Sequence, residues 1–169
     1  QTNVHTNDTA SLIDFFNQHP DLLLNFSAVK VSLSSKLNTL VPYRLFDTAD
    51  AGLYIDKTGN SSHNSGYLFD KITFNDAVNV YEINEEKLNL IQRFLPSCQL
   101  FHQLTPLLST WRNHATTIEK EAIYIFVGDK HFYISFFMDG KLQFSNRFEF
   151  ETSGDFLYYC LMVFDKFQL

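Results

Sequence analysis

Few residues in this chain have both the type and the spacing that metal binding or catalysis requires. Cys98 and His102 are four residues apart, so on a strand they would share one face, as two metal ligands could. A structural zinc site needs about four ligands, and no third group that could orient a Cys98–His102 nucleophile pair is evident. We therefore expect both side chains to serve packing, and we predict no metal site and no catalytic residue.

The acidic residues are also better explained without catalysis. Glu85 and Glu86 are adjacent, so on a helix their side chains point apart, and acids in a first helical turn favour the helix dipole. Asp47, Asp50 and Asp56 are more simply charges of loops and helix ends than a metal cluster. The sequence contains no G-x-G-x-x-G, no G-x-x-x-x-G-K followed by Ser or Thr, and no G-x-S-x-G.

Composition limits the class of protein further. The chain has 169 residues, 45% of them hydrophobic, including 18 Phe and 8 Tyr, so it can fold around an aromatic core. Its formal charge is −6 and its Arg residues are scattered, which excludes a phosphate-backbone partner such as nucleic acid. No apolar run reaches the roughly 20 residues that span a bilayer, and no signal-peptide layout is present, so we predict no membrane insertion.

Two further observations concern the compartment and the extent of the chain. Cys98 and Cys160 sit among apolar neighbours, and buried free thiols are usual in a reducing compartment, so we predict a cytoplasmic protein. The chain has no initiator Met and stops inside a helical pattern. We therefore expect it to be a segment of a longer protein.

The elements that must position any site follow from periodicity and turn residues, and they predict a mixed α/β protein. Helical spacing of Leu12, Ile13, Phe15 and Phe16 predicts a first helix that Pro20 ends. Alternation, caps and prolines predict strands near 29–34, 37–41, 67–74, 77–83 and 98–104, and helices over 85–94 and 106–113. The polar stretch 57–66 is the clearest loop.

The last fifty residues predict three antiparallel strands followed by a helix. Residues 122–127 are apolar on both faces, which predicts a central strand, and Gly128-Asp129-Lys130 predicts a tight turn. Asp139-Gly140 is a hairpin signal between the second strand and a third, one-sided strand that ends near Phe150. The helix over 156–167 is apolar almost all round, so we expect a second covering layer on it.

An apolar strand, two hairpins and a helix are the opening of a lobe in actin-like ATPases. The stretches that carry this resemblance are Ala122–Gly128, His131–Phe137, Asp139–Leu142 and Phe144–Phe148, together with Thr39–Pro42, Leu45-Phe46, Val78–Tyr81 and Asp155–Tyr159. From about Leu12 onward the chain resembles an uncharacterised bacterial family, typical of Bacteroidetes, with an actin-like ATPase fold. It is more distantly similar to actin-like pilus-assembly and type II secretion proteins.

The resemblance implies actin-like (ribonuclease H-like) lobes that are incomplete in this chain. Residues 1–116 would be the remainder of a first lobe, and residues 117–169 the β-β-β-α start of a second lobe. Nucleotide-binding members place an Asp, a Gly and a Thr or Ser around the hairpin turn. The resemblance places Phe126 at the Asp position, keeps Gly128, and puts His131 and Phe132 in the hydroxyl region, so the phosphate hairpin is degenerate and implies no bound cofactor.

The function that these observations favour is a non-catalytic actin-like scaffold that binds a protein partner or associates with itself. The expected contact residues are Tyr158, Met162 and Arg147, with the 59–66 loop as a second surface. The alternative is a weak or unusual ATPase or sugar-kinase-like enzyme, whose ATP and Mg²⁺ would be held by residues outside this segment. A third possibility, a small ligand-binding module, would require a closed pocket.

Overall fold

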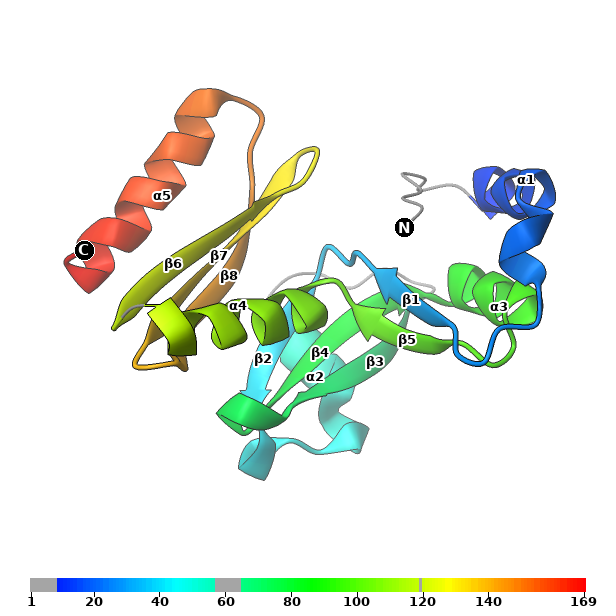
Figure 1. Cartoon of the computed structure of the whole chain (residues 1–169), viewed down its shortest axis with the longest axis horizontal. Coiled ribbons are helices and arrows are strands. Elements are labelled where there is room, and N and C mark those ends of the chain that lie inside the picture. The colour runs from blue at the N-terminus through cyan, green and yellow to red at the C-terminus, as the bar shows by residue number, and fades with distance from the viewer. Residues whose placement is uncertain (1–8, 57–64, 119) are drawn as a thin grey trace. The chain divides into compact units, whose positions relative to one another are not determined.

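The computed structural model describes residues 9–56, 65–118 and 120–169. The chain divides into two compact units, Gln1–Thr105 and Pro106–Leu169 (Figure 1). Helix α4, Leu104–Ile118, begins with the last two residues of the first unit and otherwise belongs to the second. The assignment of residues 1–116 and 117–169 to two actin-like lobes stays a prediction. No helix in the described ranges is long and apolar enough to cross a bilayer.

One part of the first unit joins two helices to a short parallel sheet. Helices α1 (Thr9–Gln18) and α3 (Glu85–Phe94) lie side by side, and the rings of Phe16 and Phe94 stack with centroids 4.6 Å apart (Figure 1). Strand β1 (Lys30–Leu33) pairs in parallel with β5 (Gln99–His102). Asn84 caps α3 as predicted, because its side-chain oxygen accepts a hydrogen bond from the Lys87 N–H at 2.9 Å.

The other part of the first unit is an antiparallel sheet in the order β2-β4-β3. These strands are Asn38–Pro42, Ala77–Asn84 and Ser65–Ile72, close to the predicted positions. Helix α2 (Ala51–Asp56) was not predicted, and it covers the sheet with Ala51 and Ile55 packed on residues of β2 and β4. The predicted 57–66 loop lies mostly outside the described residues, and Ser65 already belongs to β3.

The second unit is a three-stranded sheet with a helix on each face. Strands β6 (Glu121–Val127), β7 (His131–Met138) and β8 (Lys141–Glu149) are antiparallel, and α5 (Ser153–Phe167) lies along one face (Figure 1). On that face Phe132 and Ile134 pack against Cys160 and Val163 of α5. On the opposite face α4 places Trp111 in a stack on Tyr124 of β6, with ring centroids 5.7 Å apart.

The prediction that residues 122–127 form a central strand is wrong for the described sheet. The strand order is β6-β7-β8, so β7 is central and β6 is an edge. Burial agrees, because every residue from Phe132 to Phe137 is buried, whereas Ile125 and Val127 of β6 are 37% and 54% exposed. An apolar strand is usually interior. The apolar residues of β6 indicate that both of its faces are covered. They do not indicate how many strands pair with it.

The hairpin between β7 and β8 shows one confirmed prediction and one correction. Asp139 and Gly140 both have positive φ, 49° and 71°, as the Asp-Gly signal predicts. A β-bulge follows, so that Phe144 stands opposite Phe136 while Leu142 stands opposite Phe137. Leu142 therefore does not continue the row of Phe144 and Phe148, which the alternation alone had predicted.

Candidate functional site

The β6–β7 turn holds the residues that the resemblance places at phosphate-binding positions. Phe126 is half-buried in β6, opposite Tyr133 of β7. Phe132 is 0% exposed, and its ring lies 4.7 Å from that of Phe156 on α5. Phe132 is part of the packed core, and neither phenyl group offers an oxygen that could ligate Mg²⁺.

Gly128 and His131 close this turn against each other. A Cβ on Gly128 would lie 2.5 Å from His131 Cε1, so the imidazole rests directly on the turn backbone. The Gly128 N–H also donates to the His131 carbonyl at 2.8 Å. Burial lowers the pKa of His131, and the neighbouring Arg147 adds to this effect. The His131 imidazole is therefore neutral at pH 7 and packs against Gly128. Its buried Nε2 has no hydrogen-bond partner among the described residues.

Arg147, the third predicted contact residue, is mostly buried and forms an ion pair on its own strand. Its side chain is 15% exposed, and its Nη1 donates to Glu149 Oε1 at 3.0 Å along the same strand. Arg147 stands opposite Tyr133 in the β7–β8 pair. Burial raises the pKa of Tyr133 to about 12. Arg147 therefore has an intramolecular partner, Glu149, for its charge.

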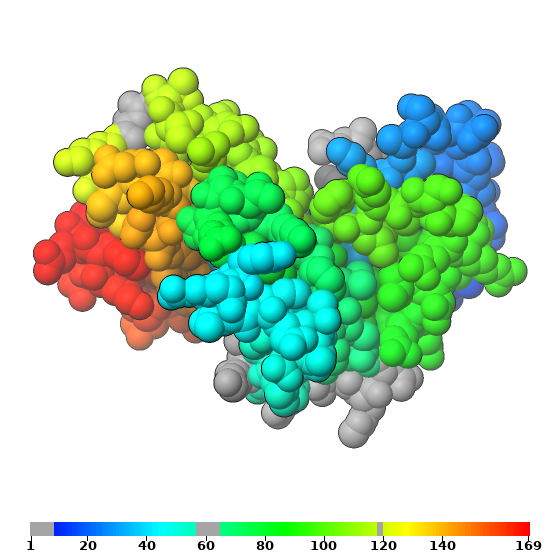
Figure 2. Space-filling model, turned by 90° about the horizontal axis from the view of Figure 1, so that it is seen from below, coloured from blue at the N-terminus to red at the C-terminus, as the bar shows by residue number. Residues whose placement is uncertain are grey.

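Helix α5 presents an apolar outer face. Its inner residues pack on the sheet, but Tyr158 and Met162 are 63% and 41% exposed, and Leu157 and Leu161 are 57% and 54% exposed. In Figure 2 the red atoms at the end of this helix lie open on the surface. These four residues, called here the α5 outer face, place two of the three predicted contact residues on one solvent-exposed stripe.

A buried polar network in the first unit was not predicted from the sequence. Asp70 of β3 is 7% exposed, and its Oδ2 accepts from the His102 backbone N–H and the Thr105 hydroxyl, each at 2.7 Å. Its Oδ1 accepts from the Tyr81 hydroxyl at 3.4 Å. Asn79 donates to Thr105 Oγ1 at 3.4 Å. The network ties β3 and β4 to the end of β5 and the start of α4.

Cys98 and His102 have separate surroundings. Cys98 packs with the cluster of Leu12, Phe16 and Leu90, and burial raises the pKa of its thiol. His102 is fully buried near Tyr81, and its Nδ1 accepts from the Leu104 N–H at 3.2 Å. Within the described ranges no group of three His, Cys, Asp or Glu residues is placed to hold a metal.

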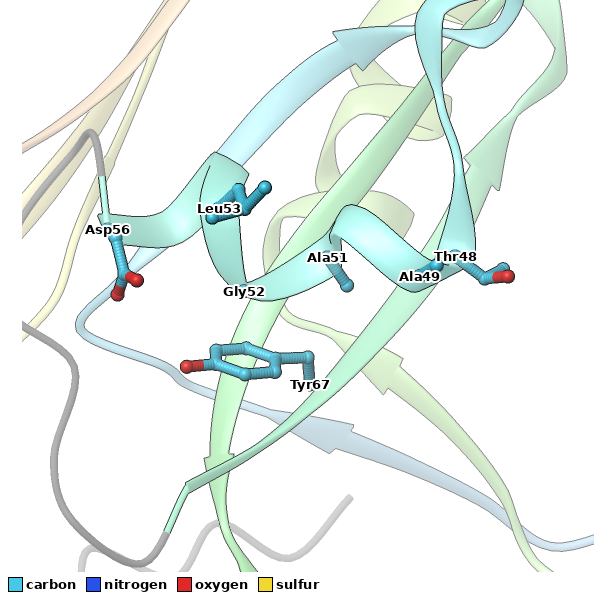
Figure 3. A pocket seen from close by; sticks show the side chains of 7 residues that line it. All are labelled: Thr48, Ala49, Ala51, Gly52, Leu53, Asp56 and Tyr67. Carbon is cyan, nitrogen blue, oxygen red and sulfur yellow. The ribbon is translucent and has the colours of Figure 1, made fainter.

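A shallow pocket of about 420 Å³ lies beside α2 and β3 (Figure 3). Figure 3 shows the Tyr67 ring beneath Gly52, with Thr48 and Asp56 at opposite ends of the helical segment. Gly52 permits this approach, because a Cβ there would lie 3.1 Å from Tyr67 Cε2. None of the described residues that line it is a His, Cys, Lys or Arg. The polar groups of the described lining are the Asp56 carboxylate and the hydroxyls of Thr48 and Tyr67.

Comparison with known proteins places the fold. A crystal structure from Bacteroides thetaiotaomicron VPI-5482, of a protein with actin-like ATPase fold and unknown function, superposes on the whole chain with a TM-score of 0.90. The two are 22% identical, and this chain covers 100% of its own length but 66% of that chain. The chain thus has an actin-like fold and spans less than two thirds of that structure.

The resemblance to a Bacteroidetes-type family is confirmed, whereas that to pilus-assembly and type II secretion proteins stays a prediction. Among curated proteins, none matches this chain. A family profile described as protein of unknown function (DUF3822) matches residues 2–169. This chain is therefore a member of the DUF3822 family.

Proposed function

We propose that this chain is part of a non-catalytic actin-like scaffold that acts by binding a protein partner. The observation that carries the proposal is the β6–β7 turn. Beside this turn Phe126 is half-buried and Phe132 is a core residue, and the His131 ring lies directly on Gly128. Phosphoryl transfer depends on positioned oxygens and cations around the phosphates. This turn has side chains of the wrong chemistry and no room for a metal-bound water between His131 and Gly128.

The α5 outer face supports the second half of the proposal. Leu157, Tyr158, Leu161 and Met162 expose a contiguous apolar stripe on a helix whose other side is already buried. Burying apolar area on a partner gains roughly 25 cal/mol per Å², and aromatic residues and Met are enriched at interface centres. A partner that covers this stripe would supply the second layer that the two-sided helix requires.

Nucleotide binding is tested first by thermal shift in the presence and absence of millimolar Mg-ATP. A ligand at about 100 times its dissociation constant stabilises a protein by roughly 2.7 kcal/mol, which gives a visible rise in Tm. We expect no rise, and a protein known to bind Mg-ATP serves as the positive control. A clear rise would refute the non-catalytic proposal and favour the ATPase or sugar-kinase alternative.

The contact surface is tested separately by substitution. Leu161→Asp places a charge in the middle of the α5 outer face, whereas Leu45→Asp changes a leucine of similar exposure in the other unit (54% and 63% exposed, respectively). We expect Leu161→Asp to abolish co-purification of the partner and Leu45→Asp to preserve it, with both variants folded by circular dichroism. Equal co-purification by the two variants would remove the α5 outer face from the proposal.

A further inference from the structure

The contact between Gly128 and His131 gives a reason for a glycine at this position. Gly128 does not have the positive φ that favours glycine, unlike Gly140. A Cβ on Gly128 would instead lie 2.5 Å from His131 Cε1, 2.9 Å from its Nε2 and 3.0 Å from its Nδ1. These ring atoms are the nearest neighbours of such a Cβ, so the missing side chain at position 128 leaves the space that the imidazole occupies.

The surroundings of the His131 ring suit a neutral imidazole. Its Nε2 is buried, and the described residues offer no acceptor for a proton on it. A neutral ring can carry its one proton on Nδ1, whereas a protonated ring also has an N–H at Nε2. A buried N–H without an acceptor is costly, and more so when it carries charge. Protonation is therefore unfavourable while the ring lies on Gly128.

The charged and titratable groups around His131 act in opposite directions. Burial lowers the pKa of His131 most, and Arg147 on β8 lowers it further. Glu149 on β8 and Asp129 in the turn raise this pKa by smaller amounts. Tyr133 of β7 meets the ring at 87° with centroids 5.7 Å apart, and it stays neutral because burial raises its pKa to about 12. Residues 122–127 of β6 carry no charge.

We propose that His131 is a pH-sensitive switch of the β6–β7 turn, in which the neutral imidazole lies on Gly128 and the protonated imidazole moves into solvent. The residue is only half-buried, so its ring can leave by rotation about its side-chain bonds while β7 stays paired. Because the displaced ring binds a proton more tightly than the covered ring, a fall in pH shifts the population toward the open turn. The open turn exposes the Gly128 backbone that the ring covers at pH 7.

The switch moves a side chain and leaves the main chain of the turn in place. The Gly128 N–H donates to the His131 carbonyl at 2.8 Å, and β6 and β7 are paired as far as Val127 and Phe132. These backbone bonds do not involve the ring, so the hairpin stays formed in both states. None of these groups belongs to the α5 outer face, so the inference does not depend on the proposed partner.

The first test is NMR spectroscopy of the chain from about pH 8 to about pH 5, the range in which histidine titrates. His131→Gln assigns the ring signals by their disappearance. At high pH we expect a nuclear Overhauser effect between the His131 Hε1 proton and the Gly128 Hα protons, because Cε1 lies on this glycine. It should vanish with the same midpoint as the protonation of His131, while the signals of α5 stay in place.

Three results of this titration would overturn the proposal. The first is an Overhauser effect that persists after the ring is protonated. The second is a ring that stays neutral throughout the range. The third is a change in the α5 signals at the same midpoint, because that would show unfolding of the unit and not a local switch.

Gly128→Ala should hold the switch open at every pH. Its Cβ takes the place of the ring, and the backbone there has no positive φ that would strain an alanine. We expect the His131 midpoint to rise toward the 6.5 of an exposed histidine. Gly154→Ala is the matched control, because a Cβ there contacts only Thr152 Oγ1, at 3.4 Å, and His131 should titrate as in the wild type. If His131 titrates in Gly128→Ala as it does in the wild type, Gly128 does not hold the ring and the proposal fails.

Discussion

Replacing Asp70 should separate the contribution of its hydrogen bonds from the cost of its charge. Asp70→Ala removes the acceptor of two buried donors, the His102 N–H and the Thr105 hydroxyl, both at 2.7 Å. Each buried donor that loses its acceptor costs about 1–3 kcal/mol, so we expect about 2–6 kcal/mol in total. That loss is a large share of the about 5–15 kcal/mol that stabilises an ordinary domain.

Asp70→Asn is the matched variant, because the amide oxygen and nitrogen of Asn can bond to the same neighbours as the two carboxylate oxygens of Asp70. The amide oxygen can replace Oδ2 and accept both donors, and the amide nitrogen can replace Oδ1 and donate to the Tyr81 hydroxyl oxygen. Asn carries no charge that burial would penalise. We therefore expect Asp70→Asn to lie within about 1 kcal/mol of the wild type at pH 7.

The comparison with Asp70→Asn also has a definite pH dependence. Burial raises the pKa of Asp70 above 3.8, against the opposing effect of hydrogen bonds from Thr105, His102 and Tyr81. The stability that protonated Asp70 contributes is full below about pH 3.8 and is lost as pH rises through the folded-state pKa. Asp70→Asn lacks this loss, so it should gain stability relative to the wild type between pH 4 and pH 7.

Urea unfolding followed by circular dichroism measures all three proteins at both pH values. The expected order at pH 7 is wild type close to Asp70→Asn, with Asp70→Ala far below both. If Asp70→Asn loses as much stability as Asp70→Ala, the carboxylate charge itself is required and the reasoning is refuted. If Asp70→Ala loses almost nothing, the two donors have found other acceptors and the network does not hold the unit together.

Four further outcomes are expected in the second unit, each measured by urea unfolding. Gly140→Ala should cost more than about 1 kcal/mol, because φ is 71° and a Cβ would lie 2.5 Å from Thr116 Cγ2, whereas Gly154→Ala should stabilise α5 by a few tenths to about 1 kcal/mol. Thr152→Ala removes the N-cap of α5 and should cost about 1 kcal/mol, and a Ser at this position should restore most of it. Burial lowers the pKa of His131 below 6.5, so the wild type should lose stability as pH falls from 6.5 to the folded-state pKa, and His131→Gln should not show that loss.

Local signals in the sequence determined much of the fold. Asp139-Gly140 has the positive φ angles that its dipeptide predicts, and Asn84 caps α3 where its position before Glu85 predicts a helix start. These features depend on a few consecutive residues and their own backbone groups, so they are visible without any tertiary contact. The same holds for the apolar inner stripe of α5, because one face of a helix repeats every few residues.

The sequence predicted the exposure of the candidate contact residues only in part. Tyr158 and Met162 lie on the α5 outer face because helical geometry sets their angle from the buried stripe. Arg147 is different, since its side chain is only 15% exposed, beside Glu149 on its own strand and opposite Tyr133 of β7. The sequence shows only that Arg147 and Phe148 lie on opposite faces of the strand. It does not show that α4 covers the second face of the sheet.

Only the tertiary structure decided the features that join distant segments. Asp70 is 32 and 35 residues from its partners His102 and Thr105, and a single acid in a strand gives no local sign that it will be buried. The edge position of β6 was likewise hidden, because its apolar pattern reports how its two faces are covered and not which strand lies beside it. The periodicity of a sequence indicates which faces of a helix or strand are buried. Strand order and the partners of buried polar groups depend instead on contacts between residues far apart in the sequence.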